Sequence, residues 1–382
     1  MIPYKHLSVL IMPTDYCNMN CVYCFNSQKT TKAKMSISDV TLRKIFSATI
    51  PYYDEVRYIW HGGEPTSMGI DFYRKALEMQ KEINKNGTIV ENSIQSNLTL
   101  LDEEFVKFFL ENNINIGGSF DGTQNHMTRH NTEQILKGRE LILQCGGKVG
   151  FICVVQSKNI DHLIEDYEWF KSKGINYTLN MYLTSPPYDN DELFVPAEKY
   201  IKKMCEFFDY WVSDKECNIN ILFFHEFIDY ILFGEKSLCS YNSCLGKHIG
   251  IRFDGEIYNC NRDFPKDLCF GNINDYVDIH ECFESDGFKK IVDEAYKRRK
   301  LCKSDCEIFD FCAGGCNSCS VTSGDISKPN DYFCEIIRNI YKYIDNRLSI
   351  LQKENLSDME HKVNPFHFKK LKYKANRKKS YD

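Results

Sequence analysis

Short β-rich segments alternate with helical patterns over residues 7–184, and this alternation constrains the fold more than any other feature of the sequence. The candidate strands are residues 7–12, 56–60, 89–95, 114–119, 148–155 and 177–182. Amphipathic stretches lie between them, at residues 38–49, 72–83, 102–111 and 160–173, and several begin with Asp or Ser, which cap helices. Repeated βα units form a parallel sheet, so we predict the α/β class and an open, partial (β/α)6 TIM-like barrel.

The pattern changes after residue 184. Two aromatic-rich helices are predicted at residues 197–212 and 221–233, and they form a bridge to a region dense in cysteine and glycine. That region cannot build a large apolar core, so metal ligation should supply its order. We predict a barrel at residues 1–184, a helical bridge at 185–238, a cysteine-rich domain at 239–350 and a basic tail at 351–382.

Cysteine usage and charge limit the class of protein. The 382 residues include 18 cysteines without an export signal, which favours reduced thiols and metal over disulfides. A formal net charge of −5 gives no global field that would attract nucleic acid. No apolar run reaches the roughly 18 to 20 residues that a membrane helix needs. We therefore expect a cytoplasmic protein with no nucleic-acid or membrane partner.

A C-x3-C-x2-C run near the start of the chain carries the most chemistry. Cys17, Cys21 and Cys24 can hold three irons of a [4Fe-4S] cubane and leave the fourth iron without a protein ligand. An iron with an open position can bind a substrate. A zinc site would more naturally close with a fourth Cys or His nearby, and none stands at that spacing.

This run, with Tyr23 in its aromatic position, resembles the signature of the radical S-adenosylmethionine (SAM) enzymes. The resemblance implies that SAM chelates the open iron and that the reduced cluster passes one electron to it. The released 5'-deoxyadenosyl radical would then take a hydrogen atom from the substrate. It also implies that Tyr23 is an aromatic wall for the adenine.

A glycine pair follows the second predicted strand. Gly62 and Gly63 can bring the backbone close to a ligand, and the carboxylate of Glu64 can accept from an ammonium group. Placed after the cysteine run, this segment resembles the radical SAM motif that holds the amino group of SAM. The same resemblance implies further cofactor contacts at later strand ends, namely Asn97, Ser119 and Arg129.

The later cysteines resemble a SPASM domain, an extension of peptide-modifying radical SAM enzymes with two auxiliary [4Fe-4S] clusters. The resemblance implies a first auxiliary cluster held by Cys244, Cys260 and Cys316, with Cys239 as a possible fourth ligand. It implies a second cluster held by Cys302, Cys306, Cys312 and Cys334. Three residues separate Cys302 from Cys306 where two are usual, and zinc ribbons of similar spacing are the alternative. Three [4Fe-4S] clusters are therefore expected.

Two groups of enzymes share this layout. One comprises the anaerobic sulfatase-maturating enzymes, which oxidise Cys or Ser to formylglycine, and the other comprises maturases that crosslink ribosomally made peptides. The first group carries an Asp base directly after the second auxiliary-domain cysteine, whereas Asn261 follows Cys260 here and cannot take up a proton. Asp263 is a weak substitute for that base. We therefore rank thioether or carbon-carbon crosslinking first, formylglycine formation second and epimerisation as a further outcome.

Partners follow from this interpretation. We expect a peptide or protein substrate and an electron donor such as flavodoxin or ferredoxin. Cys17 lies too early to leave room for a leader-binding domain before it, so recognition of any leader peptide would fall to a separate protein or to another surface. The alternative outside enzymes is a protein that only carries iron-sulfur clusters or zinc, which would not need polar residues at the strand ends.

Overall fold

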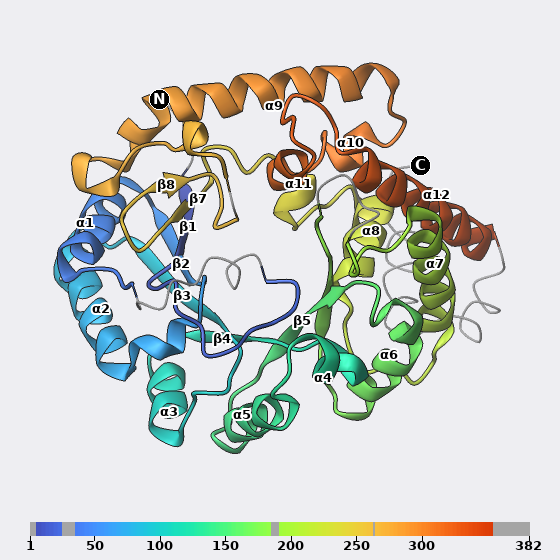
Figure 1. Ribbon diagram of the computed structural model, residues 1–382, viewed down its shortest axis with the longest axis horizontal. Coiled ribbons are helices and arrows are strands. Elements are labelled where there is room, and N and C mark those ends of the chain that lie inside the picture. The colour runs from blue at the N-terminus through green and yellow to red at the C-terminus, as the bar shows by residue number, and fades with distance from the viewer. Residues whose placement is uncertain (1–4, 25–34, 185–190, 263, 354–382) are drawn as a thin grey trace, which may run out of the picture. The chain divides into compact units, whose positions relative to one another are not determined.

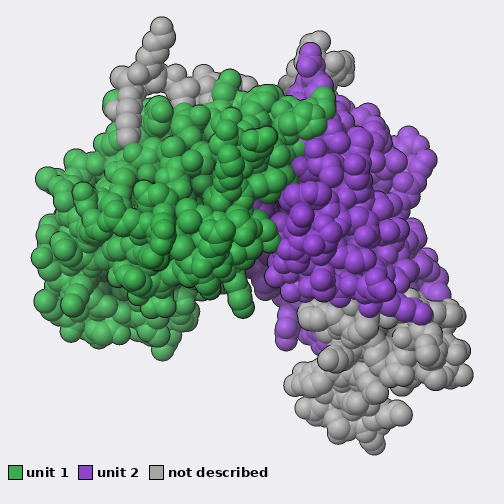
Figure 2. Space-filling model, turned by 90° about the horizontal axis from the view of Figure 1, so that it is seen from below, with its two compact units in different colours: residues 1–120, 125–150, 243–298 green, residues 121–124, 151–242, 299–382 purple. Residues whose placement is uncertain are grey.

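The computed structural model describes residues 5–24, 35–184, 191–262 and 264–353. The described chain forms two compact units, coloured separately in Figure 2. Unit 1 combines residues 1–120, 125–150 and 243–298, and unit 2 combines residues 121–124, 151–242 and 299–382. Each unit is therefore built from segments that lie far apart in the sequence.

Unit 1 is organised around a sheet whose first four strands are parallel. The strands β1 (His6–Ile11), β2 (Glu55–Trp60), β3 (Ile89–Ser96) and β4 (Asn115–Ser119) are neighbours in that order. Their register pairs Ile11 with Trp60, and Trp60 with Ile94. These strands match the predicted segments, and the predicted α/β class with a parallel sheet is confirmed.

Residues from the cysteine-rich part of the chain extend the same sheet. Strand β7 (His248–Ile251) pairs in parallel with β1, and β8 (Ile257–Tyr258) pairs with β7 in antiparallel fashion. Gly255 sits between them with φ +87°, a backbone conformation that glycine adopts without strain. The cysteines near β7 and β8 are thereby attached to the strand that leads into Cys17.

The helices of unit 1 lie along the outer side of its strands, as Figure 1 shows for α1, α2 and α3. Helices α1 (Asp39–Thr49) and α3 (Glu103–Glu111) begin after Ser38 and Asp102, whose side chains accept from Thr41 and Phe105 N–H as the predicted caps should. Buried Trp60 and Tyr73 pack edge to face at 5.5 Å beneath them. The remaining helices are α2 (Ile70–Ile83), α4 (Asn125–Thr128), α5 (Thr132–Gln144) and α9 (Asp286–Asp305), which continues into unit 2.

Unit 2 pairs β5 (Gly150–Val155) with β6 (Tyr177–Met181) in parallel and surrounds them with helices. These helices are α6 (Leu163–Ser172), α7 (Ala197–Ser213), α8 (Leu222–Phe233), α10 (Phe309–Cys312), α11 (Asn317–Thr322) and α12 (Asp331–Lys353). Short 3-10 helices in the two units span Ile50–Tyr52, Pro65–Met68, Gly122–Gln124, Ile160–His162, Cys239–Tyr241, Lys266–Leu268, Ile273–Asp275 and Ile279–Glu284. Both strands and the helices α6, α7 and α8 lie where the sequence predicted them.

Helix α12 shows that one expectation was wrong. The region after residue 239 was expected to lack a large apolar core, but α12 packs against α7 and α8 through a buried apolar face. That face consists of Phe333, Ile336, Ile337, Ile340, Ile344 and Leu348. Apolar residues three and four apart line one side of a helix, so ordinary hydrophobic packing orders this part of the chain.

Within the part of the chain that the structure describes, every helix is too short or too polar to cross a membrane.

A buried aspartate in unit 2 should make stability depend on pH. Asp166 is 2% exposed, and burial raises its pKa to about 7, although Oδ1 accepts from the N–H and hydroxyl of Thr123. Its pKa in the unfolded chain is about 4, so the folded state binds the proton more tightly. The stabilisation is complete below about pH 4 and is lost as pH rises through about 7. We expect Asp166→Asn, which carries no charge to desolvate, to remove on the order of 2–4 kcal/mol of this pH dependence.

The measurement is the unfolding midpoint in urea at about pH 5 and about pH 8, compared between wild type and variant. Asp161→Asn is the control, because Asp161 is an exposed carboxylate paired with Lys199 and should change the pH dependence little. If wild type and Asp166→Asn lost the same stability between these two pH values, the raised pKa of Asp166 would not be the cause of the pH dependence.

Candidate functional site

The three clustered cysteines lie on the loop that follows β1. Cys21 is buried, and Cys17 and Cys24 are partly exposed. The N–H of Met19 donates to Cys17 Sγ at 3.4 Å, and the N–H of Cys24 donates to the carbonyl of Cys21 at 3.0 Å. The loop therefore carries its three thiols in a backbone conformation that hydrogen bonds define.

The electrostatics of these thiols suit a positively charged group. Burial first, and then the charges of Glu64, Cys21 and Cys24, raise the pKa of Cys17 to about 12, against the donation from Met19. Thiolates bind iron, and metal binding releases the thiol protons. Because neighbouring negative charges oppose the ionisation of Cys17, a cationic metal group is what would stabilise all three thiolates together. The donor set fits a [4Fe-4S] cluster with one iron that the protein does not ligate.

The predicted glycine pair presses against this loop. Gly62 has φ +123°, and a Cβ there would lie 2.4 Å from Cγ of Met12. A Cβ on Gly63 would lie 2.2 Å from the carbonyl oxygen of Tyr16. Only glycine allows this approach. The N–H of Glu64 then donates to the Tyr16 carbonyl at 2.7 Å and joins the turn to the cysteine loop.

Glu64 is buried among hydrogen-bond donors of the chain itself. Glu64 is 1% exposed. Its Oε1 accepts from the N–H and hydroxyl of Thr66 and from the hydroxyl of Ser96. Oε2 accepts from the N–H of Asn97 at 2.8 Å. Burial raises the pKa of Glu64, and these four donors oppose that effect. Glu64 thus fixes the end of β3 to the glycine turn, and its predicted contact with SAM stays a prediction.

Asn97 faces the cysteine loop. Its Nδ2 donates to Oδ1 of Asn18 at 2.9 Å and lies 3.9 Å from Sγ of Cys17, while its Oδ1 accepts from the N–H and hydroxyl of Thr99. Hydrogen bonds to ligand sulfurs influence the potential of an iron-sulfur cluster. The structure therefore brings Asn97 to the predicted cluster site and occupies its amide there.

The other predicted cofactor contacts also lie in unit 1. The guanidinium of Arg129, a residue that is 9% exposed, stacks over the ring of Tyr23 at 5.2 Å. Ser119 ends β4, and its hydroxyl accepts from Nε2 of Gln95 at 2.8 Å, which leaves its own O–H to donate. Tyr23 and Arg129 were predicted separately, and the structure shows that they contact each other.

Two residues that the sequence did not assign as ligands carry buried polar atoms without hydrogen-bond partners. These atoms are Nδ1 of His61 and both Oδ1 and Nδ2 of Asn261. Burial and then the nearby Arg262 charge lower the pKa of His61 to about 4, so its imidazole is neutral at pH 7. Asn261 lies against Gly250, where a Cβ would be 2.5 Å from its Oδ1. Buried polar atoms usually have partners, so these positions are candidates for ligand contact. The predicted base Asp263 lies outside the described residues.

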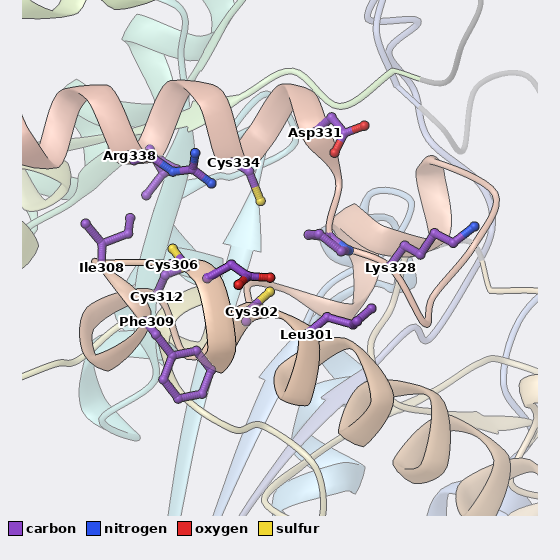
Figure 3. Close-up of a pocket in the computed structure, with 14 residues that line it drawn as sticks. Leu301, Cys302, Cys306, Ile308, Phe309, Cys312, Lys328, Asp331, Cys334 and Arg338 are labelled. Carbon is purple, nitrogen blue, oxygen red and sulfur yellow. The ribbon is translucent and has the colours of Figure 1, made fainter.

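Four of the predicted auxiliary ligands line one cavity in unit 2, shown in Figure 3. Cys302 lies on α9, Cys306 follows that helix, Cys312 ends α10, and Cys334 lies in the first turn of α12. Burial first, and then the charges of its three neighbouring cysteines, raise the pKa of Cys312 to about 12. Among the described residues, no three His, Cys, Asp or Glu side chains are placed to hold one metal ion. The four thiols instead surround a cavity of about 360 Å³, which suits a larger group.

The other predicted auxiliary ligands belong to different units. Cys244 and Cys260 lie in unit 1, whereas Cys239 and Cys316 lie in unit 2. The thiol of Cys244 donates to Oδ1 of Asn259 at 3.5 Å. Their sharing of one cluster stays a prediction.

Comparison with known proteins gives a family match and relatives along most of the chain. Residues 11–170 match the family model described as the radical SAM superfamily. A cysteine-type anaerobic sulfatase-maturating enzyme of Clostridium perfringens is 27% identical over 361 residues, which cover 90% of this chain and 97% of that relative. A serine-type anaerobic sulfatase-maturating enzyme of Bacteroides thetaiotaomicron is 25% identical over 390 residues, which cover 92% of each chain.

A solved structure agrees with these relatives. The structure of native anSMEcpe with bound AdoMet has a TM-score of 0.82 and 26% sequence identity, and the match covers 90% of this chain and 98% of that chain. A second structure of the same enzyme contains AdoMet and a Cp18Cys peptide, with a TM-score of 0.81 and the same coverage. The similarity therefore extends well beyond residues 11–170.

Proposed function

We propose that this chain, which is a radical SAM enzyme, oxidises a cysteine or serine side chain of a peptide or protein substrate to formylglycine. The observation that carries the proposal is the extent of the similarity to sulfatase-maturating enzymes, which reaches 90% of this chain and 97% of the relative. Crosslinking was ranked first from the sequence, and the comparisons favour the alternative. The relative that was solved with a bound peptide supports a peptide substrate.

The residues of unit 1 would hold the cofactors of this reaction. Cys17, Cys21 and Cys24 would ligate the cluster, and the glycine turn with Glu64 would fix the loop beside it. When bound and reduced, the cluster supplies the electron that cleaves SAM and yields the hydrogen-abstracting radical. Arg129, stacked on Tyr23, provides a positive charge for a carboxylate.

The cysteines of the later segments would hold two auxiliary [4Fe-4S] clusters, which gives three clusters in all. The cavity lined by Cys302, Cys306, Cys312 and Cys334 supports the second of them. A one-electron donor such as flavodoxin or ferredoxin would reduce the enzyme. A separate leader-binding protein would be needed only if the substrate carries a leader peptide.

Asn261 favours a second candidate, crosslinking of a ribosomally made peptide. Oxidation of a cysteine to a thioaldehyde, which water then converts to the aldehyde with release of hydrogen sulfide, requires loss of a proton as well as a hydrogen atom and an electron. A carboxamide cannot accept that proton. The side chain of Asn261 is buried with both polar atoms unpartnered. Formylglycine formation would therefore need another proton acceptor.

The test uses anaerobically reconstituted enzyme with dithionite, SAM and peptides that contain either Cys or Ser at one position. The expected product is an aldehyde, detected by mass spectrometry after trapping with a hydrazide. A matched peptide with Ala at that position is the control and should stay unchanged. Loss of two hydrogens with a new internal link would overturn formylglycine formation in favour of crosslinking, and unchanged mass with altered stereochemistry would indicate epimerisation.

A further inference from the structure

The cavity in unit 2 contains a cation beside the four thiols. Arg338 lines the same cavity as Cys302, Cys306, Cys312 and Cys334, as Figure 3 shows. It follows Cys334 by four residues on α12, so both side chains lie on one face of the helix. The positive charge is thus held by the element that carries one of the ligands.

Arg338 keeps a donor that no group of the protein uses. Its Nε is buried and has no hydrogen-bond partner. The nearest carboxylate oxygen, Oε1 of Glu307, is 3.9 Å from Nε, which is beyond hydrogen-bonding distance. Nζ of Lys342 lies 2.5 Å from that same oxygen and neutralises it. A buried guanidinium N–H without a partner is costly, so its position next to a thiol lining calls for an explanation.

Arg338 places a positive charge at the cavity that Cys334 also lines. The side chain of Arg338 is 41% exposed, so solvent weakens its charge, but its buried Nε carries that charge to the cavity, where it favours any additional negative charge. Hydrogen bonds to sulfur and net charge are two factors that set the potential of an iron-sulfur cluster.

We propose that Arg338 raises the reduction potential of the cluster held by these four cysteines, because its unused Nε–H can donate to a sulfur of the bound cluster and its positive charge lies at the same cavity. This inference rests on the proposed auxiliary cluster. Arg338 acts as a positioning residue, because it acts on the cluster and not on the substrate. One-electron reduction makes the cluster more negative, and Arg338 stabilises that reduced form.

The test is a redox titration of reconstituted full-length protein, followed by electron paramagnetic resonance. The signal of this cluster is identified as the one that Cys312→Ala removes. We expect Arg338→Gln to make the midpoint potential of this cluster more negative by about 59 mV. For one electron this shift corresponds to about a tenfold change in the ratio of reduced to oxidised cluster. Arg338→Lys keeps a charge without Nε and should shift the potential less, in the same direction.

Lys300→Gln is the matched control. Lys300 is an exposed cation two residues before Cys302, and it is not among the residues that line the cavity. Its substitution should leave the midpoint potential unchanged. The proposal would be overturned if the midpoint potential of Arg338→Gln equalled that of wild type, or if Lys300→Gln shifted the midpoint potential as much as Arg338→Gln does. If Arg338→Gln does not load iron, the test relies on Arg338→Lys, and a midpoint potential equal to that of wild type in this variant would overturn the proposal.

The outcome is separable from that of the proposed function. If the wild-type spectrum contains no signal that is lost in Cys312→Ala, the cluster assignment is overturned, and the role of Arg338 with it. Aldehyde formation on the test peptide is measured independently of that signal. Failure to detect the cluster signal therefore does not decide whether the enzyme forms an aldehyde, and failure to form an aldehyde does not decide the role of Arg338.

Discussion

Replacing Cys17, Cys21 or Cys24 by Ala should reduce the release of 5'-deoxyadenosine from SAM to the background without enzyme. A cubane with an open iron needs three thiolates, and the loop after β1 supplies three within hydrogen-bonded backbone. With two thiolates, two irons would lack protein ligands, and SAM could no longer be held and reduced at one defined iron. The measurement is chromatography of reaction mixtures that contain dithionite and SAM, together with the iron content of each variant.

Cys145→Ala is the matched control for this experiment. Cys145 is partly exposed, follows α5 and belongs to none of the predicted ligand sets. Its substitution should leave both iron content and 5'-deoxyadenosine release near the wild-type values. Because the three ligand cysteines lie in a loop, their variants should keep the circular dichroism of wild type. Substantial SAM cleavage by any of the three would contradict the assignment of that cysteine.

The strands and the helix starts were predictable because their signals are local. Alternating burial marks β1 and β2, and Ser38 and Asp102 cap the helices that follow within a few residues. The cysteine run and the glycine pair were found by spacing and residue type alone. What the sequence could not give was that Gly63 touches the backbone of Tyr16, since that contact depends on how two strand ends meet.

Long-range pairing explains the features that the sequence did not reveal. Strand β7 pairs with β1 although Ser8 and its register partner His248 are 240 positions apart in the sequence. No local pattern records such a partner. The apolar residues of α12 recur at helical spacing, but the spacing does not reveal that they pack against α7 and α8, which lie more than 100 residues earlier in the sequence. Unpartnered atoms such as Nε of Arg338 emerge only once the packing is known.

Glu64 provides the second large expected effect, because the sequence and the structure suggest different roles for it. Four donors converge on its carboxylate, from Thr66, Ser96 and Asn97. In Glu64→Gln, the amide oxygen can still accept hydrogen bonds. The new NH2 group would face a buried donor with which it cannot form a hydrogen bond. We expect a loss of about 2–4 kcal/mol, since an unsatisfied buried donor costs about 1–3 kcal/mol and bonds to charged groups are stronger than neutral ones.

The measurement is the apparent melting temperature of the reconstituted protein, which should fall by about 2–4 °C for each kcal/mol lost. Glu91→Gln is the control, because Glu91 lies on β3, the strand whose end Glu64 holds, but is exposed and pairs with Arg57 on the surface. If Glu64→Gln melts like wild type yet binds SAM poorly, the carboxylate serves the cofactor directly. If it melts early and SAM binding falls in step, its first task is to hold the end of β3 against the glycine turn. The four short bonds to a carboxylate that solvent hardly reaches favour the second result.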